Sequence, residues 1–234
     1  MFYEYYIMGV ILIPGIIFSI YAQLKVNSNF TKYHSYIAEC GRTAAEVARI
    51  FLDNAGLQNI QIVRINGHLT DHYNHRTKTI GLSESVYDST SIAAIGIACH
   101  EVGHALQYKT NYPPIRIRNL MIPICNFANR FIWILIILGA LFVYSNLGTT
   151  FLWIGVGIFA LSVLLNLVTL PVEYNASRRA TQVLYKSTIL TQEETQCTKE
   201  VLNAAALTYV AALVVSMLNL LRLLLIVGRR SNRD

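Results

Sequence analysis

The sequence predicts a mainly helical α+β protein with a small antiparallel sheet, fused to about four transmembrane helices. Of its 234 residues, 54% are hydrophobic and 14% are charged, whereas soluble domains carry about 25% charged residues. Three stretches, 5–24, 131–172 and 201–221, contain no charged residue and no histidine, and about 20 apolar residues suffice to cross a bilayer. This composition excludes a disordered chain and argues against an ordinary cytosolic domain.

The middle apolar stretch is long enough for two helices. Ser145, Asn146 and Gly148 interrupt it near its centre, which predicts a helical hairpin. We therefore expect four spans, near residues 5–23, 127–145, 150–170 and 204–227. The first is interpreted as an uncleaved anchor, because no Lys or Arg precedes it and no small-residue cleavage site follows it.

Basic residues predict the orientation of the spans. Lys and Arg flank the polar segments 25–126 and 171–203, whereas the hairpin turn and the residues before the first span have none. Both polar segments are therefore expected on the cytoplasmic side of the cell membrane, in a multi-pass protein. The basic tail fits this rule only if the last helix re-enters, and the sequence leaves open whether that helix spans fully. The net charge of +6 comes from scattered residues, which favours contact with the lipid bilayer over nucleic acid.

The first polar segment carries clear helix and strand signals. Thr43 and Glu46 match a capping box and Gly56 supplies a stop, so they delimit a helix. Residue patterns along this segment predict a helix over 44–54, strands over 60–65 and 77–82, and a helix over 91–107. These strands are expected to belong to a small antiparallel sheet of two or three strands.

After the hairpin, we expect a helix over 173–185 and then a second capping box, formed by Thr191 and Glu194, that begins the last helix. Glu193 and Glu194 are interpreted as solvated capping residues. The cysteines are not arranged in C-x-x-C pairs, so they are interpreted as free thiols in a reducing compartment. They are Cys40, Cys99, Cys125 and Cys197.

The residues that point to chemistry lie within the expected helix 91–107. His100, Glu101 and His104 match H-E-x-x-H, and side chains four residues apart lie on one helical face, where two imidazoles can hold one Zn²⁺. The intervening Glu can act as general base and then general acid for a zinc-activated water. The alternative is a pair of histidines that merely pack or hydrogen bond.

A catalytic zinc site takes three protein ligands and keeps one position open. No histidine follows His104 in the sequence, so we expect a carboxylate as the third ligand. Glu173 is the preferred candidate, because the hairpin returns the chain to the side that carries His100 and His104. The alternative for Glu173 is an interfacial helix-capping role.

The same motif, together with the segment Pro-Val-Glu-Tyr-Asn-Ala-Ser-Arg-Arg-Ala at 171–180, resembles the YugP-like family of bacterial membrane zinc metallopeptidases. This resemblance extends over nearly the whole chain. It implies a zincin-like, more narrowly gluzincin-like, core with two His ligands and one downstream Glu. Related membrane proteases have Asp four residues after that Glu, where this chain has Ser177. Asn175 or Ser177 is therefore considered as the residue that orients a ligand.

The sequence thus favours a membrane-embedded zinc metallopeptidase that binds one zinc ion per chain. Its expected substrates are peptides or proteins, including membrane proteins. The alternative is a non-catalytic zinc-binding scaffold or chaperone, for which His72 or His75 would supply a fourth ligand. Arg178 is a candidate for stabilising the oxyanion, and strand 77–82 is a candidate sheet edge that binds substrate.

These expectations divide the chain into five segments. They are an N-terminal anchor (1–24), a metallopeptidase segment with the H-E-x-x-H helix (25–126), a transmembrane hairpin (127–170), a segment with the third ligand and a connecting helix (171–203), and a C-terminal membrane helix with its basic tail (204–234).

Overall fold

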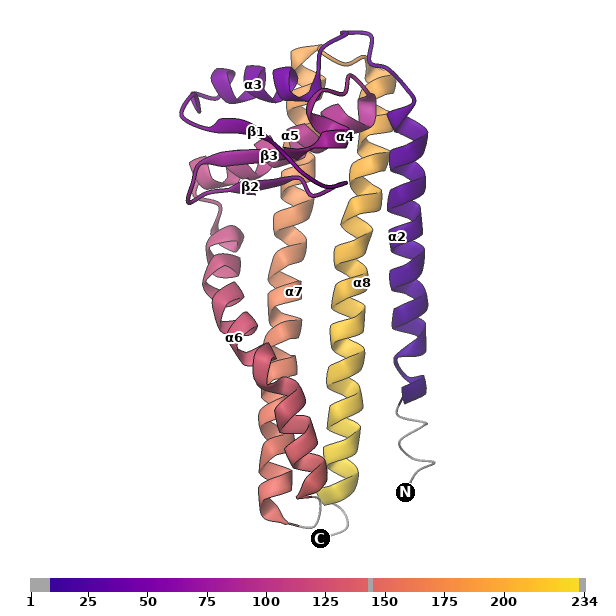
Figure 1. Ribbon diagram of the computed structural model, residues 1–234, viewed down its shortest axis with the longest axis vertical. Coiled ribbons are helices and arrows are strands. Elements are labelled where there is room, and N and C mark those ends of the chain that lie inside the picture. The colour runs from indigo at the N-terminus through magenta and orange to yellow at the C-terminus, as the bar shows by residue number, and fades with distance from the viewer. Residues whose placement is uncertain (1–8, 143–144, 232–234) are drawn as a thin grey trace. The chain divides into compact units, whose positions relative to one another are not determined.

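The computed structural model describes residues 9–142 and 145–231 (Figure 1). Its elements in chain order are α2 (Ile13–His34), α3 (Ala44–Asn54), β1 (Gln61–Ile65), β2 (His72–Asn74), β3 (Thr79–Ser83), α4 (Glu84–Tyr87), α5 (Ile92–Lys109), α6 (Pro113–Leu141), α7 (Asn146–Ser187) and α8 (Gln192–Ser231). The chain forms two compact units. Of the described residues, the first unit holds 9–22, 114–170 and 208–231, and the second holds 23–113 and 171–207.

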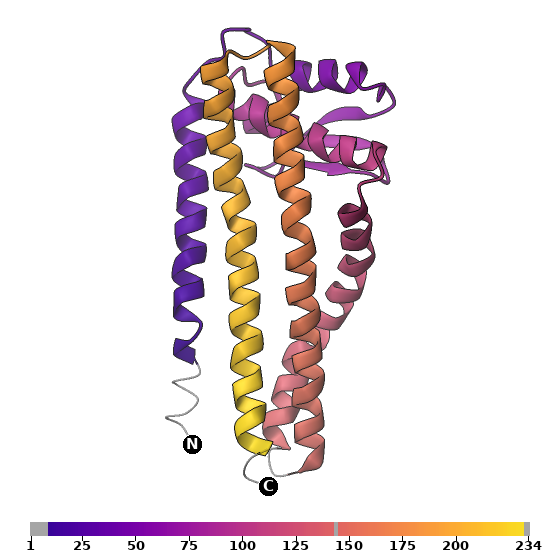
Figure 2. The ribbon, with the colours of Figure 1, turned by 180° about the vertical axis from the view of Figure 1, so that it is seen from behind.

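The first unit consists of long apolar helices. In the part of the chain that the structure describes, three helices, α6, α7 and α8, are long and apolar enough to cross a membrane. α6 and the first part of α7 form the predicted hairpin, beside which the last part of α8 runs in both views (Figures 1 and 2). The fourth expected span, 5–23, lies partly outside the described residues, and α2 is not one of the three.

α7 and α8 are longer than the sequence predicts. α7 joins the expected span 150–170 and the expected helix 173–185 in one helix of 42 residues, with Pro171 inside it. A proline inside a helix removes one backbone hydrogen bond and crowds the carbonyl four residues earlier, yet α7 continues through Pro171 to Ser187. α8 is likewise unbroken over 40 residues, and Val227 near its end packs with Leu152 near the hairpin turn. Within this unit the last helix therefore runs without a break to the level of the hairpin turn.

The second unit contains a three-stranded mixed sheet in the order β1-β3-β2. The two predicted strands, β1 and β3, pair in parallel, so the expectation of an antiparallel pair between them is wrong. The antiparallel pair is formed by β2 and β3. The sequence analysis missed β2, whose hairpin turn is marked by Asn74: its side-chain oxygen accepts the backbone N–H of Arg76 at 3.0 Å. β3 thus lies in the centre of the sheet, so the expectation that 77–82 is a free edge is wrong.

Both capping boxes are confirmed. α3 runs over the predicted residues, with Thr43 and Glu46 bonded to each other's backbone N–H, and Gly56 adopts a left-handed φ of +66° just after it. At the start of α8, the Thr191 N–H donates to the Glu194 carboxylate at 2.8 Å. That carboxylate also accepts the Glu39 N–H at 2.8 Å and is buried, so the solvated interpretation of Glu194 is wrong.

Candidate metal site

α5 presents the two motif histidines because its other faces are packed. Ser91 caps the helix by accepting the backbone N–H of Ala94, which satisfies one of the first-turn donors. Ile95, Cys99 and Val102 form an apolar stripe that is buried in the core of the second unit. The side chains of His100 and His104 retain 15% and 12% exposure respectively. The helix therefore fixes both imidazoles on one accessible side.

Glu173 reaches these histidines because α7 approaches α5 closely. A Cβ atom on Gly103 would lie 2.5 Å from the main-chain oxygen of Ala176, a separation that no side chain tolerates. Glycine at this position of the motif therefore permits the backbone contact between the two helices. Because Ala176 lies less than one helical turn after Glu173, the same contact places the carboxylate opposite the histidines.

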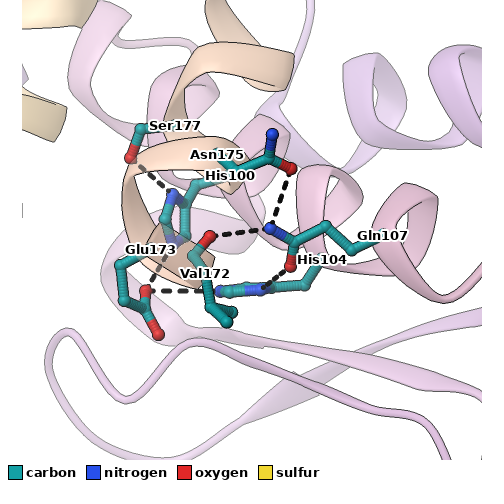
Figure 3. Close-up of polar contacts among 7 residues, drawn as sticks. All are labelled: His100, His104, Gln107, Val172, Glu173, Asn175 and Ser177. Atoms are coloured by element: carbon teal, nitrogen blue, oxygen red, sulfur yellow. Dashed lines mark hydrogen bonds and ion pairs between the residues drawn. The ribbon is translucent and has the colours of Figure 1, made fainter. Parts of the chain in front are cut away.

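The three side chains form a compact group of metal-ligand type (Figure 3). Glu173 Oε2 lies 3.3 Å from His100 Nε2 and 3.5 Å from His104 Nε2, and one ligand atom from each residue lies within 4.8 Å of the others. Zinc bonds of about 2.0–2.2 Å in tetrahedral geometry imply ligand atoms about 3.3–3.6 Å apart. The two measured distances fall in this range. Among the described residues, no other group of this kind is found.

The second ring nitrogen of each histidine is held by a neighbour. His100 Nδ1 lies 3.1 Å from the hydroxyl of Ser177, one of the two residues considered for orienting a ligand. His104 Nδ1 lies 3.0 Å from the side-chain oxygen of Gln107, a residue that sequence reasoning did not assign to the site. Its position three residues after His104 on the same helical face was the available signal.

Neither of the hydrogen bonds found for the Asn175 side chain involves a histidine. The Asn175 side-chain oxygen accepts from Gln107 Nε2 at 3.1 Å and from Arg179 Nε at 2.8 Å, so it acts on the site through Gln107. Arg178 is exposed, and none of the contacts described for the site residues involves it.

Glu101 is 6% exposed. Burial raises the pKa of its carboxyl above the ordinary glutamate value, and the neighbouring His104 and His100 oppose this shift. A glutamate with a raised pKa can hold a proton more readily at neutral pH, as a group that first accepts and then donates a proton must.

The other histidines considered as ligands lie elsewhere. His72 Nδ1 donates to the Thr70 carbonyl at 3.0 Å. His75 stacks on Tyr108, with ring centroids 4.6 Å apart, and its Nδ1 lies 3.0 Å from the Tyr108 hydroxyl. Neither joins the group formed by His100, His104 and Glu173.

Apolar helices long enough to span a membrane, together with an H-E-x-x-H helix that meets a glutamate from a later helix, define a class of membrane protein with a metallopeptidase-type site. The chain belongs to the family described as "Putative neutral zinc metallopeptidase", whose model matches residues 8–228. It is 42% identical over 216 residues to "Putative membrane protease YugP" of Bacillus subtilis (strain 168), an alignment that covers 92% of this chain and 94% of that protein. No solved structure matches the chain.

Proposed function

We propose that this membrane protein is a zinc metallopeptidase that hydrolyses peptide bonds with zinc-activated water. The observation that carries the proposal is that the Glu173 carboxylate lies 3.3 Å from His100 Nε2 and 3.5 Å from His104 Nε2. Glu101 lies on the same helix as the two histidines. The family and relative described above support a zinc peptidase in name. Our proposal assigns to these residues the activity that those names suggest.

The donor set fits zinc. Two imidazole nitrogens and one carboxylate oxygen are the ligands found in catalytic zinc sites of the His₂Glu type. Each imidazole has its Nδ1 engaged, by Ser177 or by Gln107, so that its Nε2 is directed to the shared centre. His100, His104 and Glu173 would hold the ion.

The chain's own residues would supply proton transfer. Bound zinc would provide Lewis acidity and favour hydroxide at neutral pH. Glu101 would accept the proton of the attacking water on its carboxylate and then deliver it to the leaving amine. Because Glu101 is buried and its pKa is raised, it can carry that proton between the two steps. General acid–base catalysis of this kind contributes typically about 10²–10⁴-fold.

A non-catalytic zinc scaffold is the competing function. A structural zinc site has four protein ligands, whereas a catalytic site keeps one position for water or substrate. Within the described residues, the ligand group contains three members, and His72 and His75 have other partners. This count favours the catalytic alternative.

The substrate is proposed to be a peptide or protein in extended conformation, with membrane proteins included. Because β3 is central, an added strand has to pair with an outer strand of the sheet. β2 is an outer strand, and it contacts the α5 helix that carries the histidines. We therefore propose that the substrate binds to the edge formed by β2 and not to β3.

The site is proposed to face the cytoplasm, since Lys and Arg flank both polar segments. Single cysteines at Lys78 and Lys186 should be labelled from the same side of the membrane, and a cysteine at Asn146, near the hairpin turn, from the other side. Labelling of the parent protein measures the background from its native cysteines. Opposite accessibility of the two lysine positions would exclude the proposed ligand set.

The decisive experiment compares Glu101→Gln with His100→Ala in the full chain. Glu101→Gln should keep zinc and lose about 10²–10⁴-fold in cleavage of an unfolded protein, because the amide cannot accept the proton. His100→Ala should lose zinc and activity together. Zinc content is measured by metal analysis on the same samples. If zinc-loaded Glu101→Gln cleaves as fast as the parent protein, the hydrolase proposal fails.

A further inference from the structure

Gln107 is fully buried on α5, and both the NH₂ group and the oxygen of its amide are engaged by neighbours (Figure 3). Its Nε2 donates to the main-chain carbonyl of Val172 at 2.7 Å and to Asn175 Oδ1 at 3.1 Å. Its Oε1 faces His104 Nδ1 at 3.0 Å. A main-chain carbonyl can only accept, so the NH₂ group has to face Val172 and the oxygen has to face His104.

The orientation of Asn175 is fixed in the same way. Its Oδ1 accepts from Arg179 Nε at 2.8 Å as well as from Gln107. A guanidinium can only donate hydrogen bonds and stays protonated, so Arg179 requires an acceptor on Asn175. The Val172 carbonyl can only accept and the Arg179 guanidinium can only donate. Together they determine which atom donates and which accepts in each hydrogen bond that links Arg179 to His104 through Asn175 and Gln107.

The direction of these bonds determines the tautomer of His104. Since Gln107 Oε1 can only accept, His104 Nδ1 has to carry the proton, and in the neutral ring Nε2 is left with its lone pair. That lone pair faces the Glu173 carboxylate oxygen at 3.5 Å. Neutral imidazole with a free lone pair on Nε2 is the form that binds a metal.

His100 differs in this respect. Its Nδ1 faces the Ser177 hydroxyl at 3.1 Å, and a hydroxyl can donate or accept. Ser177 therefore orients the ring without determining which nitrogen carries the proton. Of the two histidines, only His104 has its tautomer fixed by its neighbours.

We infer that Gln107, Asn175 and Arg179 form a positioning relay that holds His104 in the Nδ1–H tautomer and so prepares its Nε2 to bind zinc. The inference rests on the proposed zinc site but not on peptide hydrolysis. None of the three residues needs to touch the substrate. The outer partners of a metal-bound histidine typically change metal affinity by about 10–100-fold when they are lost.

The test measures zinc affinity of the full chain in detergent, by competition with a chromophoric chelator. Gln107→Leu and Asn175→Leu should each raise the zinc dissociation constant about 10–100-fold. Asn175→Asp keeps an oxygen that accepts from both Gln107 and Arg179, so it should stay within about threefold of the parent protein, less than the 10–100-fold loss of a missing partner. Gln182→Leu, at an exposed position of the same helix, is the matched control and should also be unchanged.

A second measurement reports the tautomer directly. Nitrogen-15 NMR of the histidine rings in the zinc-free protein is recorded at a pH at which the rings are neutral, and His104 is assigned by the loss of its signals in His104→Ala. The spectrum should show the Nδ1–H form of His104. Asn175→Leu should populate both tautomers of His104 and leave His100 unaffected. A general loss of structure would affect both rings alike and lower the thermal unfolding temperature, so the NMR result separates positioning from folding.

The relay is overturned if Asn175→Leu binds zinc as tightly as Asn175→Asp, or if His104 in the parent protein carries its proton on Nε2. These outcomes are independent of hydrolysis. If Glu101→Gln remains active while the relay variants lose zinc affinity, the peptidase mechanism fails and the relay stands. If the parent protein binds no zinc, the proposed function fails, and the tautomer measurement still decides on the relay.

Discussion

The two parts of α7 have the same helical backbone and opposite surroundings. In residues 146–170, which belong to the first unit, large apolar side chains are exposed, such as Leu164 at 53%. In residues 171–187, which belong to the second unit, Leu184 is fully buried and Glu173 is 2% exposed. The first part resembles a helix that relies on lipid for its apolar environment, whereas the second packs its side chains against protein.

This difference determines in which part of α7 the truncation of a side chain should lower the free energy of unfolding. A leucine exposed to lipid is already in an apolar medium, so its truncation creates no cavity and transfers little surface from water. A leucine in the protein core leaves a cavity when it is shortened. The same contrast holds for polar groups, because the second unit surrounds its buried carboxylates with specific partners. Three pairs of substitutions test this comparison.

The largest effect is expected at the carboxylates of the second unit. Glu173→Ala should weaken zinc binding by more than about 100-fold, since loss of an outer partner of a ligand already costs 10–100-fold. Glu194→Ala should retain zinc, because its carboxylate binds the N–H groups of Thr191 and Glu39. Leaving those buried donors unsatisfied should lower the free energy of unfolding by about 1–3 kcal/mol. Metal analysis and thermal unfolding measure the two effects, and equal zinc content in Glu173→Ala and the parent protein would refute the ligand assignment.

An intermediate effect is expected for leucines in the two parts of α7. Leu184→Ala should lower the free energy of unfolding by about 2–5 kcal/mol, because it opens a cavity in a packed core. Leu164→Ala is the matched substitution on the same helix and should change it by less than about 0.5 kcal/mol, as surface changes generally do. Unfolding is followed in one detergent for both variants. Similar losses for the two leucines would show that 146–170 is packed against protein.

The smallest effect is expected at two helical glycines. Gly103→Ala places a methyl group 2.5 Å from the Ala176 carbonyl oxygen, so α5 and α7 have to separate. We expect a loss of about 1–3 kcal/mol in the free energy of unfolding, as in other overpacked sites, together with weaker zinc binding. A methyl group added at Gly157 would meet no atom within 4 Å, so Gly157→Ala should be neutral or stabilising by up to about 1 kcal/mol. A fully zinc-competent Gly103→Ala protein would show that the close helix contact does not position Glu173.

The sequence by itself determined the features that depend on neighbouring residues. His100 and His104 share a helical face because they are four residues apart, and the capping boxes at Thr43 and Thr191 close local hydrogen bonds that any helix start requires. The apolar stretches identified the long helices, since bilayer thickness sets their length. The choice of Glu173 also came from the sequence, through the hairpin that returns the chain.

Tertiary structure alone decided the features that join distant segments. Glu194 is buried because the N–H of Glu39, 155 residues earlier, needs an acceptor, and no local pattern reveals such a pairing. β3 is central because β1 pairs with one of its edges and β2 pairs with the other. Gln107 belongs to the site only because α7 brings the Val172 carbonyl and Asn175 to it. In each case the hydrogen-bonding partner lies in a distant part of the chain or in a strand that the sequence does not specify. Only tertiary packing determines which partner that is.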